Sequence, residues 1–153
     1  MFCEWSVAGK PSVLGIISGA VAGLVAVTPA AGFVNPTGAL MVGVVAGIVC
    51  YLAAVKVKHA LGYDDSLDAF GVHGVGGVVG ALLTGLLADP AINSLGENAS
   101  VTTQLYGIVF TIVWTAVATL AILVLVKALV GLRPSAQEEI EGLDVTQHGE
   151  AVP

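Results

Sequence analysis

The sequence predicts an all-α membrane protein, a polytopic helical bundle with four transmembrane helices. Of its 153 residues, 56% are hydrophobic and only 10% are charged, and the mean hydropathy is +0.95. A water-soluble domain of this size does not need so much apolar surface. The apolar residues also gather in four stretches, each close to the roughly 20 residues with which a helix crosses the hydrocarbon of a bilayer.

The four spans can be placed in order along the chain. We expect them at about residues 12–31, 38–55, 68–88 and 104–130. The first two are joined by a short uncharged turn, and the last is long enough to tilt or to protrude from the bilayer. Residues 1–132 are therefore expected to form a transmembrane region, and residues 133–153 a polar cytoplasmic tail.

The basic residues predict the orientation of these helices. Lys10 precedes the first span, Lys56 and Lys58 follow the second, and Lys127 and Arg133 lie at the end of the fourth. With four crossings, every one of them falls on the same side. By the positive-inside rule that side is the cytoplasm, so both ends of this chain are expected there, in a multi-pass protein of the plasma or inner membrane.

Small residues recur at four-residue spacing within the spans. Each of the first three spans carries glycines on one helix face. They are Gly15, Gly19 and Gly23 in the first span, Gly43 and Gly47 in the second, and Gly76 and Gly80 in the third. Such faces allow helix backbones to approach closely in lipid, which favours a tight bundle. The alternative is that this spacing has no special role, because it is common in polytopic proteins.

Charge and cysteine usage exclude several classes of function. The formal net charge is −6, but the membrane part is close to neutral, so nucleic acid is not an expected partner. Cys3 and Cys50 lie far apart, and Cys50 falls within an apolar stretch. We interpret both as small hydrophobic residues and expect no disulfide, no metal site and no cofactor.

One histidine lies where lipid would surround the helix. His73 belongs to the uncharged run from Phe70 to Ala88, and an ionisable group at that depth usually faces a cavity or a pathway. Helical spacing continues its face through Gly77, Gly80 or Ala81, and Thr84, which carry little side-chain bulk. The alternative is a structural histidine that bonds a neighbouring helix. His59, beside the lysines, is expected in a solvated loop.

The acidic residues before this span are predicted to cap it. Asp64, Asp65 and Asp68 lie at its start, where carboxylates accept hydrogen bonds from free amides and complement the helix dipole. For Asp68 a second role remains open, which is to stabilise a cation or a polar path.

The stretch from Asp64 to Gly77, DDSLDAFGVHGVGG, resembles the signature of the Amt/Mep/Rh ammonium transporter family. Segments along the whole chain resemble the same family in the same order, and the tail motif resembles its Amt branch. These segments are Glu4-Trp5, Gly9–Ser12, Thr28–Val34, Ile112–Trp114, Gly131–Arg133, Glu141–Asp144 and His148–Glu150.

This resemblance implies the last four helices of an eleven-helix, homotrimeric transporter that takes up ammonium as a nitrogen source, and not an enzyme. His73 matches the second histidine of the family's pore pair. Asp68 matches an acidic position at the cytoplasmic start of that helix, and Phe70 with Gly71 matches the lead-in to the histidine. These four residues are the expected substrate pathway for ammonium and ammonia.

The resemblance also implies a regulatory tail. In the Amt branch the tail packs under the cytoplasmic face, where a PII signalling protein binds in many bacterial members, and the threonine that matches Thr146 is phosphorylated in some plant members. Without the resemblance, the tail would be interpreted as a disordered acidic end. The expected regulatory residues are Gly131, Arg133, Gly142, Asp144, Thr146, His148, Gly149 and Glu150.

The partner histidine of the pore pair has no match in this sequence. We therefore expect a C-terminal fragment that does not conduct ammonium by itself. A second interpretation is a non-transporting membrane subunit that regulates full-length copies of the transporter. A third, an intramembrane enzyme with His73 as its base, has little support, because no nucleophile or carboxylate pair lies at membrane depth.

Overall fold

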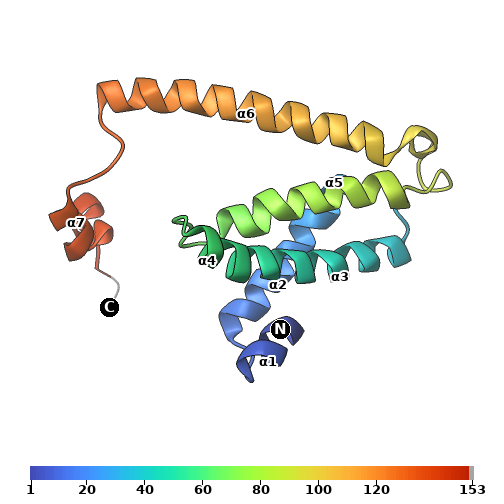
Figure 1. Cartoon of the computed structure of the whole chain (residues 1–153), viewed down its shortest axis with the longest axis horizontal. Helices are drawn as coiled ribbons and strands as arrows, with labels where there is room; N and C mark the ends of the chain where they lie inside the picture. Colours follow the sequence, from blue (N-terminus) through green and yellow to red (C-terminus); the bar gives the residue numbers. More distant parts are fainter. Residues whose placement is uncertain (152–153) are drawn as a thin grey trace. The chain divides into compact units, whose positions relative to one another are not determined.

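A computed structural model describes residues 1–151, and within them it contains helices and no strand (Figure 1). The all-α prediction is confirmed, with four helical segments long and apolar enough to cross a membrane. They are α2 (Val13–Val27) with a 3₁₀ turn (Thr28–Ala30), α3 (Pro36–Leu52) continuing into α4 (Lys58–Leu61), α5 (Val75–Leu87) with the turn before it, and α6 (Val101–Leu129). Two short helices, α1 (Phe2–Ala8) and α7 (Ala136–Glu141), lie nearer the ends of the chain.

Two helical segments contain a π-helical turn. Ala53–Val57, the α3 π-turn, joins α3 to α4, and Phe70–Gly74, the α5 π-turn, leads into α5. Because the helix continues through the first of these turns, the second apolar segment runs from Pro36 to Leu61, six residues beyond the predicted end. The prediction that His59 lies in a loop is wrong: it belongs to α4, where its side chain is exposed.

Polar side chains define where the helices begin. Asn35 caps α3 by accepting a 2.9 Å hydrogen bond from the amide of Gly38. Ser12 caps α2 in the same way through the amide of Gly15, and the carboxylate of Glu4 accepts bonds of 2.9 and 2.6 Å from the amide and hydroxyl of Ser12. These bonds hold the pKa of Glu4 below its usual value and connect α1 to the start of α2.

Small residues pack α5 against α2. The buried set contains mostly small side chains, including Ala22, Ala26 and Ala46. A Cβ added to Gly80 would lie only 2.1 Å from the carbonyl oxygen of Ala26, so the glycine allows these two backbones to touch. The predicted small-residue contact is therefore present for Gly76 and Gly80. Gly23, Gly43 and Gly47 have no such neighbour within 4 Å among the described residues.

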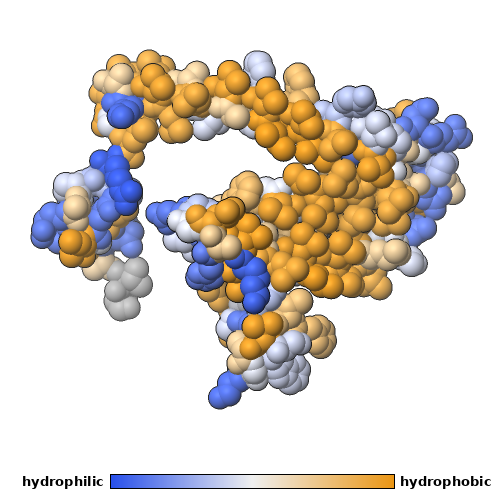
Figure 2. All heavy atoms as spheres, viewed as in Figure 1, coloured by the Kyte–Doolittle hydropathy of each residue, from blue (hydrophilic) through white to orange (hydrophobic). Residues whose placement is uncertain are grey.

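The outward side chains are those expected beside lipid. Figure 2 shows hydrophobic residues along the long helices, with hydrophilic residues gathered at the loops and in the tail. Leucines, valines and isoleucines of α2, α3 and α6 are extensively exposed. In water such a surface would be unfavourable, whereas in a bilayer it meets acyl chains of the same polarity.

The chain divides into two compact units, Met1–Phe110 and the part from Thr111 onward, with the boundary inside α6. In the second unit, α7 starts with a reciprocal capping box. Ser135 accepts from the amide of Glu138, whose carboxylate accepts from the amide of Ser135. A π-helical turn at Asp144–His148 follows.

The contact between Gly80 and Ala26 predicts an asymmetry between two glycines of α5. Replacing Gly80 by alanine should destabilise the bundle by about 1–3 kcal/mol, because the new methyl group would force the two helices apart. Gly77→Ala is the matched control, since no described atom outside its own stretch of helix lies within 4 Å of its Cβ position. Unfolding in detergent micelles measures both, and equal stability of the two variants would contradict the packing described.

The capping box predicts that α7 loses helicity in acid. Hydrogen bonds from Ser135 lower the pKa of Glu138 from the usual 4.5, because they favour the ionised carboxylate. Such a group stabilises the folded state above its unfolded pKa, and this contribution is lost as the pH falls through the folded pKa. NMR of the tail should show constant α7 helicity at neutral pH and a decline below pH 4.5. The decline should be smaller in Ser135→Ala, which lacks the hydroxyl of the capping box. An identical titration of this variant and the unchanged chain would contradict the role given to the capping box.

Candidate functional site

His73 lies in the α5 π-turn on the face that points away from the neighbouring helices. Gly71 and Val72, just before it, are buried, whereas His73 is exposed. The side chain of Val72 packs with Ala22 and Cys50, so the opposite side of this turn contacts α2 and α3. The imidazole is therefore available to whatever covers this face of α5.

Asp65 supplies the predicted cap of this segment. Its carboxylate accepts hydrogen bonds of 2.8 and 2.9 Å from the amides of Ala69 and Phe70. The prediction that Asp68 also caps through its carboxylate is wrong. That carboxylate forms an ion pair with Lys58, whose ammonium also donates a 3.0 Å hydrogen bond to the carbonyl oxygen of Asp65.

Gly71 is the point where α5 comes closest to the preceding helix. A Cβ added to it would lie 3.0 Å from the backbone nitrogen and Cα of Ala54 in the α3 π-turn. The two π-turns thus touch through their backbones. Phe70 is more than half exposed, and its ring meets that of Tyr63 edge to face at a centroid distance of 5.9 Å.

The small-residue face predicted to continue from His73 is only partly present. Gly77 is open, with no atom within 4 Å of its Cβ position among the described residues. Gly80 and Thr84 are instead buried, and the hydroxyl of Thr84 donates a 2.8 Å hydrogen bond to the carbonyl of Gly80. The prediction is therefore wrong for Gly80 and Thr84, and the close contact of Gly80 with Ala26 shows that α5 packs against α2 in this part of the helix.

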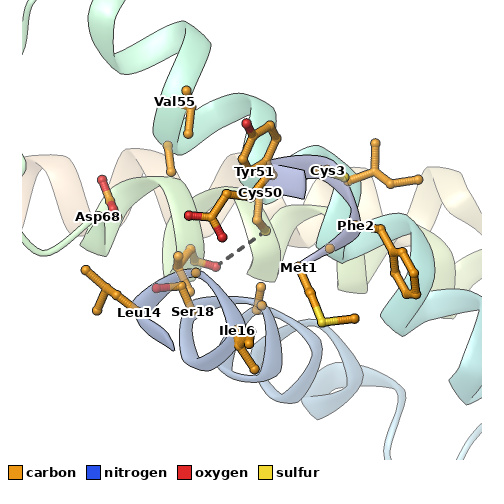
Figure 3. Close-up of a pocket in the computed structure, with 18 of the residues that line it drawn as sticks. Met1, Phe2, Cys3, Leu14, Ile16, Ser18, Cys50, Tyr51, Val55 and Asp68 are labelled. Carbon is orange, nitrogen blue, oxygen red and sulfur yellow. Dashed lines mark hydrogen bonds between the residues drawn. The ribbon is translucent and has the colours of Figure 1, made fainter. Parts of the chain in front are cut away.

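A cavity of about 610 Å³ lies on the other side of the same helices. Figure 3 shows side chains of α1, α2 and α3 around it, with Asp68 at one side. His73 is not among the lining residues. Cys3 and Cys50, which also line it, are free thiols, and Cys50 packs as a small buried residue beside Val72.

The predicted tail residues lie in a separate unit with its own contacts. Arg133 donates a 3.0 Å hydrogen bond to Glu139, and this interaction keeps the pKa of Glu139 below its usual value. The hydroxyl of Thr146 donates to the carbonyl of Gly142, and the amide of Glu150 donates to the carbonyl of Asp144. Left-handed or related positive-φ conformations occur at Gly131, Gly142 and Gly149, whereas His148 is exposed at the end of the π-helical turn.

Residues 1–152 match the model of the Ammonium Transporter Family. The chain belongs to this family. The ammonium transporter of Aquifex aeolicus is 50% identical over 155 residues, which cover 98% of this chain but 36% of that protein. Ammonium transporter Amt1 of Archaeoglobus fulgidus is 47% identical, over 98% of this chain and 39% of its own length.

Solved structures of the family share the fold. Saccharomyces cerevisiae Mep2 superimposes with a TM-score of 0.78 at 37% identity, over 90% of this chain and 34% of its own. A sensor Amt protein gives a TM-score of 0.83 at 28% identity, over 95% of this chain and 37% of its own. The chain therefore spans little more than a third of the length of these proteins, and the two curated relatives are named ammonium transporters.

Lys58 is the site residue that sequence reasoning missed. In the sequence, its charge indicates only the orientation of the helices. In the structure, its ammonium contacts both Asp65 and Asp68. The available signal was a lysine at the end of one apolar span, ten residues before an aspartate at the start of the next. Opposite charges at the two ends of a short connection between antiparallel helices are placed to pair.

Proposed function

We propose that this chain is the C-terminal part of an ammonium transporter, and that it contributes one pore histidine, His73, together with the regulatory tail. The observation that carries this proposal is the exposure of His73 on a membrane-spanning helix whose opposite face is packed. An ionisable side chain is costly against acyl chains, so such a position suits a pathway completed by other parts of a transporter.

The chemistry of the segment fits the transport of ammonia. A bare ammonium ion loses its hydration at large cost when it enters an apolar pore, whereas neutral ammonia loses far less. A neutral imidazole can donate one hydrogen bond and accept another, so His73 can hold ammonia without a net charge. Phe70, which is exposed, forms the approach to it, whereas Gly71 packs against Ala54 on the other side of the turn and Asp68 lies at the start of the same helix.

The orientation and the assembly belong to the same proposal. Both ends of the chain are placed in the cytoplasm, with residues 1–132 in the membrane and 133–153 below it, and the complete transporter is a homotrimer. The tail then lies where a PII signalling protein can bind. Phosphorylation at Thr146 would add charge beside the carbonyl of Gly142, to which its hydroxyl now donates.

A second candidate is a non-transporting membrane subunit that regulates full-length copies. It is favoured by the length of the match, because 98% of the chain aligns with only 36% of the Aquifex aeolicus transporter. Such a subunit would copurify with a complete transporter and would change its uptake without any flux of its own.

The fragment proposal predicts complementation. In liposomes the chain alone should carry no ammonium, because the partner histidine of the proposed pore pair has no match in this sequence. Coexpressed with the preceding two-thirds of the Aquifex aeolicus transporter, in cells without their own transporters, it should restore uptake of labelled methylammonium. His73→Ala should abolish this uptake, and His59→Ala, a change at an exposed histidine of α4, should leave it unaltered.

Each result has a distinct meaning. Flux through the chain alone that His73→Ala removes would refute the fragment proposal. Restored uptake that survives His73→Ala would refute the role of the histidine. Copurification with the intact Aquifex aeolicus transporter, with altered uptake and without complementation of its truncated form, would favour the regulatory subunit.

A further inference from the structure

We propose that the Lys58–Asp68 ion pair is a latch that sets the register of the α5 π-turn, and with it the direction in which His73 points. Lys58 is thereby a positioning residue for the histidine. The importance of the latch for transport rests on the proposed function, whereas its effect on the turn can be measured without transport.

The latch joins the end of one span to the start of the next. Lys58 begins α4, and its ammonium reaches across the connection to the carboxylate of Asp68 and the carbonyl of Asp65. Asp65 in turn binds the amides of Ala69 and Phe70. One lysine therefore anchors the residues from which the α5 π-turn begins.

The backbone at Asp68 shows why an anchor is needed. It has φ of +55°, and it is the one non-glycine residue with positive φ in the described part of the chain. L-amino acids adopt this region at a cost, which Asp and Asn tolerate better than most residues. From this conformation the carbonyl of Asp68 accepts a 2.8 Å hydrogen bond from the amide of Val72, so the strained residue starts the helical turn.

Two backbone contacts hold the α5 π-turn and the helix that follows it. Within the turn, Gly71 touches Ala54, and beyond the turn, the contact of Gly80 with Ala26 holds α5 against α2. A π-turn contains one residue more than an α-turn and is an uncommon conformation. If the latch opens, the turn can relax to α-helix, and the residues before Phe70 then rotate by about 100° relative to α5, while those within the turn rotate by less.

This rotation would turn His73 toward the packed side of the helix, where Val72 now lies. His73 is exposed and Val72 is 7% exposed, so they now lie on opposite sides of the turn. Lys58 and Asp68 retain 21% and 32% of their side-chain exposure, and a partly exposed pair contributes little to global stability. Its loss should therefore change the register of the turn more than the melting temperature.

The test compares the reactivity of thiols placed at these two positions. In a Cys3→Ser, Cys50→Ala background, Val72→Cys or His73→Cys is introduced, and the full chain in lipid nanodiscs reacts with a maleimide. The thiol at position 73 should react much faster than that at 72. Lys58→Met and Asp68→Asn should each reduce this ratio by about tenfold, equivalent to about 1.4 kcal/mol.

Two matched variants separate positioning from general damage. Lys58→Arg keeps the charge and should preserve the ratio, and so should Lys56→Met, which removes an exposed lysine from the neighbouring α3 π-turn. Asp68→Asn keeps both the shape of the side chain and its tolerance of positive φ. Amide exchange at residues 70–74 in the native-cysteine chain provides a second measurement, and protection there should fall in Lys58→Met but not in Lys58→Arg.

If Lys58→Met and Asp68→Asn both leave the ratio of thiol reactivities and the amide exchange at residues 70–74 unchanged, the latch proposal is wrong. A uniform loss of protection along α3 and α5 with a lower melting temperature would also overturn it, because that result describes a pair with only a structural role. In the complementation assay, Lys58→Met should reduce uptake and Lys58→Arg should restore it. A complex that never transports refutes the proposed function, while the thiol ratio still decides whether the latch exists.

Discussion

The structure depends on the close approach of helix backbones that glycine allows. Gly80 lies against the carbonyl of Ala26, and Gly71 lies against the backbone of Ala54. In a bilayer the exclusion of water does not drive helices together, so association depends on such packing. These two contacts place α5 on α2 and on the end of α3, and they decide which side of the helix remains free. The exposure of His73 is a consequence of this packing.

Charged side chains are confined to the ends of the membrane-spanning segments, as an apolar surround requires. Asp65 satisfies the amides that start the α5 segment, Asn35 those that start α3, and Lys58 pairs with Asp68 between the two spans. At the other end of α5, the amide of Asp89 donates a 2.7 Å hydrogen bond to the carbonyl of Phe33, and its carboxylate accepts from Asn35. The same interactions that satisfy the backbone therefore connect successive spans at both ends of α5.

Family membership and local geometry give complementary information about the site. The match to the Ammonium Transporter Family covers nearly the whole chain but about a third of its relatives. The geometry shows a packed face and a free face on α5, with the histidine on the free one. The pathway proposed above, which other segments would complete, is consistent with both facts. The tail belongs to the second unit, in which it has its own capping box and ion pair.

The sequence by itself determined the number of spans, the close packing at Gly76 and Gly80, the cap at Asp65 and the resemblance that led to the family. Each depends on local composition or spacing, which the chain carries in any conformation. It did not reveal the two π-turns, the burial of Thr84 or the partner of Asp68. Spacing arguments assume a uniform helix of 3.6 residues per turn, and a π-turn is a departure held in place by contacts between segments distant in the sequence. Only the tertiary structure, by bringing Ala54 against Gly71 and Lys58 against Asp68, decided which way His73 faces.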